Sequence, residues 1–189
     1  MPLPKKNEFI SEAEYLAGEK DAEERHEYVN GQIHAMAGSS LRHNDIALNL
    51  AFALRTAAQG KPCRVNVSDV KVYLASSKAY YYPDVVLGCE EEPDGAYALK
   101  NPCLIAEVTS QSTQWRDFTE KALAYQKLAS LQVYLVIAQD MVEVTQYYRD
   151  AEGLWQVQRF DDLEQSVALV CIDRSVTVQE IYAGVVFSR

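Results

Sequence analysis

Residues 103–109 read Cys-Leu-Ile-Ala-Glu-Val-Thr, a near-continuous apolar run with one acidic residue, Glu107. The segment Tyr80–Leu87 has the same character and contains one acidic residue, Asp84. Runs without polar alternation are typical of strands that are buried on both faces at the centre of a sheet. These two segments therefore decide the fold, and each brings one carboxylate into an apolar setting.

Two long helices and further strands surround this pair in the sequence. Ile46, Leu50 and Leu54 recur every four residues and indicate a long amphipathic helix. A second helix is expected after residue 112, followed by another buried strand. The predicted core order is a helix over 41–59, strands over 65–74, 80–87 and 103–109, a helix over 113–129 and a strand over 133–138.

The remaining segments add a hairpin before this core and a meander after it. Asn30-Gly31 is a strong hairpin signal, because a type I′ turn needs positive φ at both positions. The apolar phase slips at Ser68-Asp69, which predicts a bulge or bend. Alternating strands are expected over 141–149, 154–160 and 167–171, and a short helix over 178–183. The chain is predicted to be a mixed α/β (α+β) protein.

Asp84 and Glu107 stand where carboxylates are costly, because an unpaired buried charge costs several kcal/mol. Pro83 places Asp84 near the beginning of its strand or at a bend, since proline is tolerated at a strand's start. If the two strands run antiparallel, both carboxylates can meet at one end of the sheet. A divalent cation such as Mg²⁺ would then offset their repulsion. The alternative is that Asp84 caps a turn and Glu107 pairs with a lysine.

The second predicted helix places Asp117, Lys121 and Tyr125 on one stripe, because residues four apart face the same side. An apolar stripe lies beside it, so Lys121 stands at the border of the buried face and can point over the end of the sheet. The alternative is a surface ion pair between Asp117 and Lys121, worth roughly a few tenths of a kcal/mol.

The composition is that of a single globular domain. The chain has 189 residues, of which 48% are hydrophobic and 24% charged, which excludes a disordered or disulfide-dense chain. Its formal net charge is -9, so it should not be attracted as a whole to nucleic acid or to an anionic membrane. A local basic patch, bound metal or dimerisation would be needed to offset that charge.

The cysteines and the apolar segments predict a cytoplasmic protein. Cys63, Cys89, Cys103 and Cys171 contain no Cys-x-x-Cys pair and lie in or beside apolar segments, which predicts reduced core residues and no zinc site. No signal peptide is visible in residues 1–8. No segment reaches the roughly 18 apolar residues of a membrane span.

Several short motifs follow one another in a fixed order along the chain. They are Glu27-Tyr28-Val29-Asn30-Gly31, His43, Pro83-Asp84, Glu107-Val108-Thr109-Ser110, and the stripe of Asp117, Lys121 and Tyr125. Their order and spacing resemble the Uma-type family of bacterial endonucleases, in the PD-(D/E)XK nuclease superfamily. The resemblance covers most of the chain and implies a single nuclease-like domain over 1–189. Its restriction-endonuclease-like core, with a mixed central sheet, would span about 24–138.

The resemblance also implies a chemistry for these residues. It is the hydrolysis of phosphodiester bonds in DNA with Mg²⁺ or Mn²⁺ held by Asp84 and Glu107. Lys121 would orient the attacking water or neutralise developing charge. Glu27 would be an additional metal or water ligand. His43 has two open interpretations, a contact to substrate phosphate or an exposed polar residue.

The chain departs from the superfamily pattern at one catalytic position. The pattern has a lysine two residues after the second acid, and here that position is Thr109. The resemblance therefore implies a migrated lysine, supplied by Lys121 from the helix. This is physically acceptable, because what matters is where the ammonium group lies.

Two other functions remain open from the sequence. One is a non-catalytic nuclease-fold protein that serves as an accessory or binding module, which the net charge of -9 and the displaced lysine favour. The other is a carboxylate enzyme such as a glycosidase, which the lack of an aromatic cluster near either acid disfavours. A homodimer is also predicted, because the C-terminal strands leave apolar faces and edges uncovered and a DNA duplex presents two strands to cut.

Overall fold

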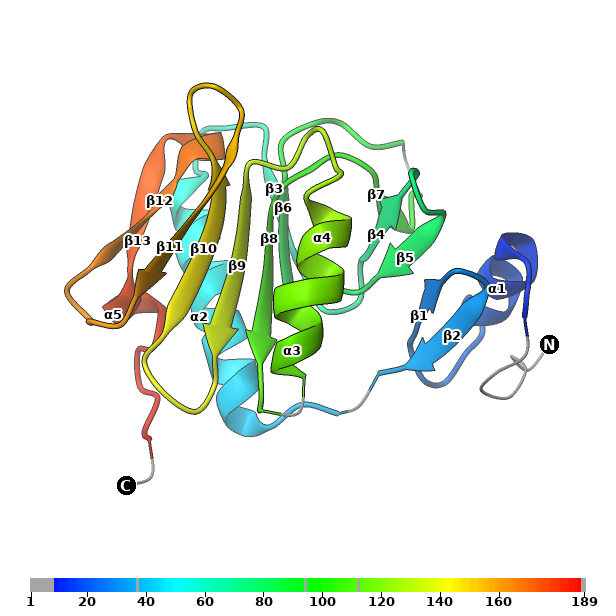
Figure 1. The fold of residues 1–189 in the computed structure, drawn as a ribbon, viewed down its shortest axis with the longest axis horizontal. Helices are drawn as coiled ribbons and strands as arrows, with labels where there is room; N and C mark the ends of the chain where they lie inside the picture. Colours follow the sequence, from blue (N-terminus) through cyan, green and yellow to red (C-terminus); the bar gives the residue numbers. More distant parts are fainter. Residues whose placement is uncertain (1–8, 37, 94, 112, 188–189) are drawn as a thin grey trace.

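The computed structural model describes residues 9–187 except 37, 94 and 112 (Figure 1). The predicted absence of a signal peptide in residues 1–8 lies outside the described residues. In chain order the elements are α1 (Glu12–Glu19), β1 (His26–Val29), β2 (Gln32–Ala35), α2 (Leu41–Ala57), β3 (Arg64–Val67), β4 (Lys71–Leu74), β5 (Ala79–Tyr81), β6 (Val85–Gly88), β7 (Ala98–Leu99), β8 (Pro102–Thr109), α3 (Gln114–Arg116), η1 (Asp117–Lys121), α4 (Ala122–Tyr125), β9 (Val133–Ala138), β10 (Val144–Arg149), β11 (Trp155–Phe160), β12 (Ser166–Leu169), η2 (Val170–Ile172), β13 (Arg174–Thr177) and α5 (Val178–Ile181).

A six-stranded sheet in the order β11-β10-β9-β8-β6-β3 forms the centre of the molecule. Strands β8 and β9 pair in parallel, whereas β6 pairs antiparallel with β8, so the predicted mixed central sheet is confirmed. In that register Val85 lies opposite Ala106. Asp84 and Glu107, one step further along each strand, therefore come to the same end of the sheet.

The central sheet has a helical layer on each face (Figure 1). Helix α2 buries Ile46, Leu50 and Leu54 in a core cluster with alternate residues of β8, Leu104 and Ala106. The intervening residues of β8 point to the opposite face, because successive side chains in a strand alternate. There Ile105 packs in a second cluster with residues of α4 and of a smaller sheet, in the order β2-β1-β5-β4-β7. Glu107 belongs to this second face.

Two of the predicted strands are each divided between the two sheets. The segment expected over 65–74 is β3 in the central sheet and β4 in the smaller one, and Ser68, at φ 52°, lies at the predicted slip. The segment expected over 80–87 is divided in the same way into β5 and β6. Pro83 lies at that break, since proline cannot donate a ladder hydrogen bond. Each segment is therefore two strands where one was expected, but the predicted bend at Ser68-Asp69 and the predicted bend at Asp84, just before β6, are confirmed.

The second long helix is confirmed but is interrupted. It comprises α3, the π-helical turn η1 and α4. Together these three cover 114–125, whereas a helix over 113–129 was expected. Single π turns inside α-helices frequently occur at functional sites. Within the described ranges, no helix combines the length and apolarity needed to cross a bilayer.

The hairpin and the C-terminal strands largely follow the prediction. Asn30 and Gly31 have φ of 50° and 80°, as the turn between β1 and β2 requires. The first two strands of the expected meander, β10 and β11, pair antiparallel in the central sheet beside β9. Strand β12 instead pairs with β13, which the sequence did not predict, in a separate two-stranded sheet before α5.

The prediction of four reduced cysteines is wrong for two of them, because Cys63 and Cys89 form a disulfide. The two cysteines are 26 residues apart, so no local sequence pattern indicated that they pair. Strands β3 and β6 are antiparallel with Arg64 opposite Gly88, so the cysteines at the neighbouring positions also face each other. Cys103 and Cys171 carry free thiols.

Candidate active site

Asp84 is held at the start of β6 by the backbone of the neighbouring strand. Its Oδ2 accepts a hydrogen bond from the Val108 N–H at 2.7 Å. The same oxygen lies 3.2 Å from Nε2 of His43. The Asp84 carboxylate therefore binds β8 at Val108, the residue that directly follows Glu107.

Glu107 is almost fully buried, with 4% of its surface exposed. Its Oε1 accepts hydrogen bonds from Lys121 Nζ at 2.9 Å and from the Tyr125 hydroxyl at 2.8 Å. Burial raises the pKa of Glu107 to about 8, even though the nearby Lys121 ammonium lowers it. The charges of Asp84, Asp117 and Glu27 raise the pKa of Glu107 further. The ionised form of Glu107 therefore needs a nearby positive charge.

Lys121 lies at the end of the π turn and contacts three carboxylates. Its Nζ is 2.9 Å from Glu107, 3.2 Å from Glu27 and 3.6 Å from Asp117. Burial alone would lower the pKa of Lys121, but the three carboxylates raise it above its usual value. The alternative of a surface Asp117–Lys121 pair is wrong, because only 8% and 6% of the two side chains are exposed.

Glu27 enters the site from the β1–β2 hairpin. Besides Lys121, it binds Arg116, whose Nη1 lies 2.8 Å from Glu27 Oε2. Arg116 Nη2 is 3.5 Å from a Glu120 oxygen and makes no hydrogen bond within the described part of the chain. Two ion pairs thus tie the hairpin to the helix, although the hairpin belongs to the smaller sheet.

His43 lies in the first turn of α2, which Ser40 caps by accepting a hydrogen bond from the His43 N–H. Burial lowers the pKa of His43, but the hydrogen bond and charge of Asp84 outweigh that effect and raise it. The side chain is 16% exposed, so the interpretation as an exposed polar residue is wrong. The structure leaves its contact to substrate as a prediction.

The residues that the sequence assigned to the site line one cavity of about 330 Å³. The structure thus brings together Asp84, Glu107, Lys121, Glu27 and His43. Two further residues, which the sequence did not assign to the site, are Asp117 and Arg116. The stripe of Asp117, Lys121 and Tyr125, spaced four residues apart, was a signal for Asp117, whose pKa is raised by burial. The sequence contains no comparable signal for Arg116, because its partner Glu27 lies on a distant hairpin.

The charges in this cavity are unbalanced. Four of the described lining residues are carboxylic acids, namely Glu27, Asp84, Glu107 and Asp117, and two carry permanent positive charge, Arg116 and Lys121. The hydrogen bonds of the described residues engage one oxygen of Asp84 and one of Glu107, and none engages the second oxygen of either. Two carboxylates with an oxygen to spare fit Mg²⁺, which takes one or two carboxylates and completes its shell with water. Among the described residues no cluster of three or more ligating His, Cys, Asp or Glu side chains is preformed.

The stability of the metal-free protein should fall as pH rises from about 4.5 to about 8. The folded state retains a proton on Glu107 in this range that the unfolded state releases, so the contribution is complete below the unfolded pKa and is lost as pH rises through about 8. Each unit of pKa difference is worth about 1.4 kcal/mol. Urea unfolding across this range should show a shallower fall for Glu107→Gln, which cannot titrate.

The matched control for this measurement is Glu152→Gln, at an exposed glutamate, which should reproduce the wild-type profile. Asp117 and His43 also have raised pKa values, so a smaller decline should remain in Glu107→Gln. A profile as steep as that of the wild type would show that Glu107 ionises normally in the folded state.

The chain matches a protein family and similar proteins along most of its length. A family model described as "Putative restriction endonuclease", Uma2, matches residues 12–179. Two similar proteins of Synechocystis sp. are the uncharacterized proteins slr1290 and sll1609. The first is 32% identical over 187 residues, which cover 98% of this chain and 96% of the relative. The second is 35% identical over 150 residues, which cover 78% and 85%.

A solved structure has the same fold. It is described as a "putative nuclease belonging to DUF820" from Anabaena variabilis, and it superposes with a TM-score of 0.77 over 94% of this chain and 99% of that chain. At 16% identity this likeness concerns the fold alone. It agrees with the nuclease-like fold that the resemblance implied.

Proposed function

Because this chain belongs to the Uma2 family, described as "Putative restriction endonuclease", we propose that it is a metal-dependent endonuclease that hydrolyses phosphodiester bonds in DNA. One observation carries the proposal. Asp84 and Glu107, 23 residues apart in the sequence, line the same cavity, and the Lys121 ammonium is 2.9 Å from Glu107. Two acids and a lysine around one cavity are the groups that this chemistry requires.

In the proposed mechanism Asp84 and Glu107 would hold Mg²⁺ or Mn²⁺. The metal, when bound, lowers the pKa of a water ligand and stabilises negative charge on the phosphoryl group. The pKa of Lys121 is raised, so its ammonium group stays charged at neutral pH. This charge lies beside Glu107, where it would orient the attacking water. It thereby takes the role that Thr109 cannot fill.

Supporting residues position this group. The Tyr125 hydroxyl and the Lys121 ammonium donate to the same oxygen of Glu107, Oε1. These two bonds hold the carboxylate in place and leave Oε2 for the metal. Glu27 and Asp117 hold the ammonium from two further sides. His43 orients Asp84 and lies at the cavity wall, where a protonated imidazole favours a phosphate.

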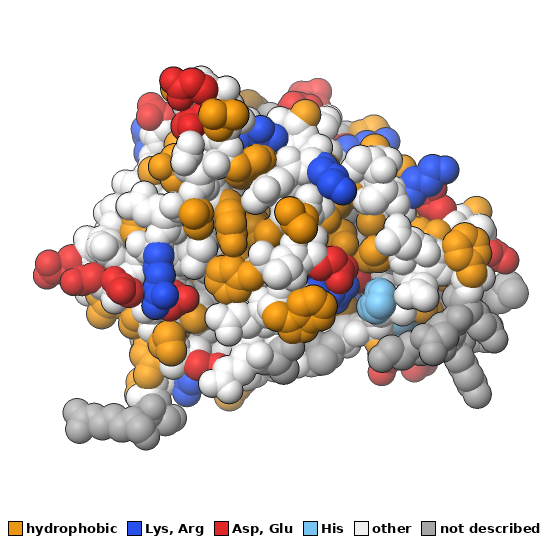
Figure 2. Space-filling model, viewed as in Figure 1, with side chains coloured by type: hydrophobic (Ala, Val, Ile, Leu, Met, Phe, Trp, Pro, Cys, Tyr) orange, Lys and Arg blue, Asp and Glu red, His pale blue; other side chains and the backbone are white. Residues whose placement is uncertain are grey.

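An accessory, non-catalytic role is the second candidate, and one observation favours it. Lys121 is enclosed by three carboxylates, so its ammonium is already neutralised in this arrangement. The Lys and Arg side chains on the face drawn in Figure 2 are also dispersed among acidic and apolar ones. A cleavage assay separates the two functions, since an accessory protein would leave plasmid DNA intact.

Divalent metal should stabilise the folded protein. Mg²⁺ or Mn²⁺ that binds only the folded state raises the melting temperature, by an amount that grows with metal concentration. Scanning calorimetry with increasing Mn²⁺, and with Ca²⁺ or K⁺ at matched ionic strength, measures the specific shift. A melting temperature that does not respond to any divalent metal would contradict the proposed metal site.

The protein should also form a homodimer, in which two sites cut the two strands of a duplex. Large apolar side chains are exposed on several elements, among them Phe52 on α2, Trp115 on α3 and Val157 on β11. A second copy of the chain covering such a surface would remove apolar area from water. Light scattering at micromolar concentration should give twice the chain mass of 21.3 kDa, and the monomer mass would refute this prediction.

A further inference from the structure

All four cysteines gather at the end of the central sheet opposite the candidate active site, although they are scattered along the sequence. Cys63 precedes β3, Cys89 follows β6, and Cys103 is the second residue of β8. Cys103 Sγ lies 3.8 Å from Cys89 Sγ, and Cys89 is disulfide-bonded to Cys63. Cys171, from η2, interacts with the Cys103 thiol and raises its pKa.

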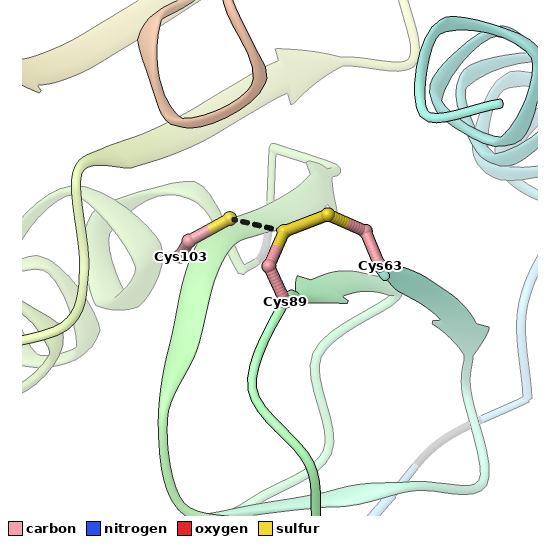
Figure 3. The surroundings of a disulfide bond; sticks show 3 residues. All are labelled: Cys63, Cys89 and Cys103. Atoms are coloured by element: carbon pink, nitrogen blue, oxygen red, sulfur yellow. Dashed lines mark hydrogen bonds between the residues drawn. A yellow bond between two sulfur atoms is a disulfide. The ribbon is translucent and has the colours of Figure 1, made fainter. Parts of the chain in front are cut away.

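The three sulfurs are arranged in the order that an exchange reaction needs. Figure 3 shows the Cys89 sulfur between the other two, with the Cys103 sulfur on the side away from Cys63. Thiol–disulfide exchange passes through an attacking, a central and a leaving sulfur. Here Cys103 stands in the attacking position, Cys89 in the centre and Cys63 in the leaving position.

The backbone at Cys103 is also irregular. In the β6–β8 ladder Leu87 lies opposite Leu104, but Gly88 lies opposite Pro102, so Cys103 has no partner across the ladder. A bulge of this kind re-aims the side chain of the extra residue. It leaves Cys103 free of a cross-strand partner at the point where its sulfur meets the disulfide. All four cysteines are partly accessible to solvent.

We propose that Cys63, Cys89 and Cys103 form a thiol–disulfide exchange site, in which one disulfide moves between two positions. The Cys103 thiol first loses its proton to solvent. Its thiolate then forms an S–S bond with Cys89, the Cys63–Cys89 bond breaks, and its electron pair leaves on Cys63, which takes up a proton. The number of disulfides and thiols is unchanged, so the step needs no oxidant or reductant. One state ties β3 to β6 and the other ties β6 to β8.

The exchange has a structural consequence beyond the cysteines themselves. Strands β6 and β8 are the two strands that carry Asp84 and Glu107 at their other ends. The second state would cross-link this pair directly. The inference itself does not depend on the proposed nuclease activity, because it rests on sulfur positions alone.

Peptide mapping tests the proposal directly, because trypsin is expected to place each cysteine in a different peptide. The sequence predicts peptides 56–64, 79–100, 101–116 and 160–174, which carry Cys63, Cys89, Cys103 and Cys171 in that order. The full chain, purified without reductant, is held without oxygen in mildly alkaline buffer, acid-quenched, alkylated and digested. We expect two linked pairs, 56–64 with 79–100 and 79–100 with 101–116, in wild-type protein.

Three variants sharpen the result. Cys103→Ser should lose the 79–100/101–116 link and keep the other. Cys171→Ser should keep both, because Cys171 takes no part in the exchange. Cys63→Ser, oxidised with a small organic disulfide, should convert Cys89 almost completely to the link with Cys103. Wild-type protein in which peptide 101–116 is never linked to 79–100 overturns the proposal, whether or not Cys63 and Cys89 are bonded.

Discussion

Replacing Glu107 with glutamine or Asp84 with asparagine should reduce single-turnover cleavage of plasmid DNA in Mn²⁺ by about three orders of magnitude. Both substitutions keep the shape of the side chain and an oxygen that can accept the existing hydrogen bonds from Lys121 or Val108. Each removes one negative charge that the metal needs. Charge stabilisation by a bound metal is worth several kcal/mol, and each ~1.4 kcal/mol is tenfold in rate.

The same variants should also lose the rise in melting temperature that Mn²⁺ produces in the wild type. In the metal-free state they should fold normally, because each amide keeps the shape of the carboxyl group and an oxygen that accepts the existing hydrogen bonds. Glu152→Gln, at an exposed glutamate far along the chain, should cleave like the wild type. Variants that retain full cleavage would show that these carboxylates do not hold the catalytic metal.

Replacing Lys121 with alanine should reduce cleavage by about a hundredfold to a thousandfold, because a preorganised charge at the reacting centre is worth several kcal/mol. Metal affinity should change little or rise, since a nearby positive charge opposes cation binding. Lys121→Arg should not restore full activity, because a planar guanidinium cannot occupy the position of a compact ammonium. Lys127→Ala, at an exposed position six residues on, is the control.

The structure changes what is expected for the stability of this variant. Lys121 is 7% exposed and compensates three carboxylates, so its loss leaves buried charge unpaired and should cost about 3–5 kcal/mol. Cleavage is therefore compared at a temperature at which melting curves show every variant folded. Lys121→Gln, which keeps hydrogen-bond donors without the charge, separates the lost charge from the lost contact. Near-wild-type cleavage by folded Lys121→Gln would refute the migrated-lysine assignment.

The local elements were predictable because their causes are local. The recurrence of Ile46, Leu50 and Leu54 defines the buried stripe of α2, and positive φ at Asn30 and Gly31 defines the hairpin turn. The apolar run over 103–109 also identified the central strand β8. These patterns depend on residues a few positions apart, and the chain sequence states them directly.

The predicted strand boundaries were wrong where one segment contributes to two sheets. Periodicity alone could not show that 65–74 and 80–87 each cross from one sheet to the other, because a strand pattern carries no information on its partner. The regular helix also ended earlier than expected, at Tyr125 in place of Ala129, and includes a π turn at Asp117–Lys121. The phase slip at Ser68-Asp69 and the proline before Asp84 were the local signs of these two crossings.

By itself the sequence indicated most of the helices and strands and singled out two candidate acids, Asp84 and Glu107, because carboxylates in apolar strands are costly and therefore conspicuous. Only the tertiary structure decided how they are compensated. Glu27 is 94 positions from Lys121 in the sequence, yet its carboxylate lies 3.2 Å from the ammonium. The tertiary structure likewise brings Arg116 into an ion pair with Glu27 and places the Cys103 sulfur next to the Cys89 sulfur. Such contacts are set by strand register and by the packing of one sheet against a helix, and those are properties of the folded chain as a whole.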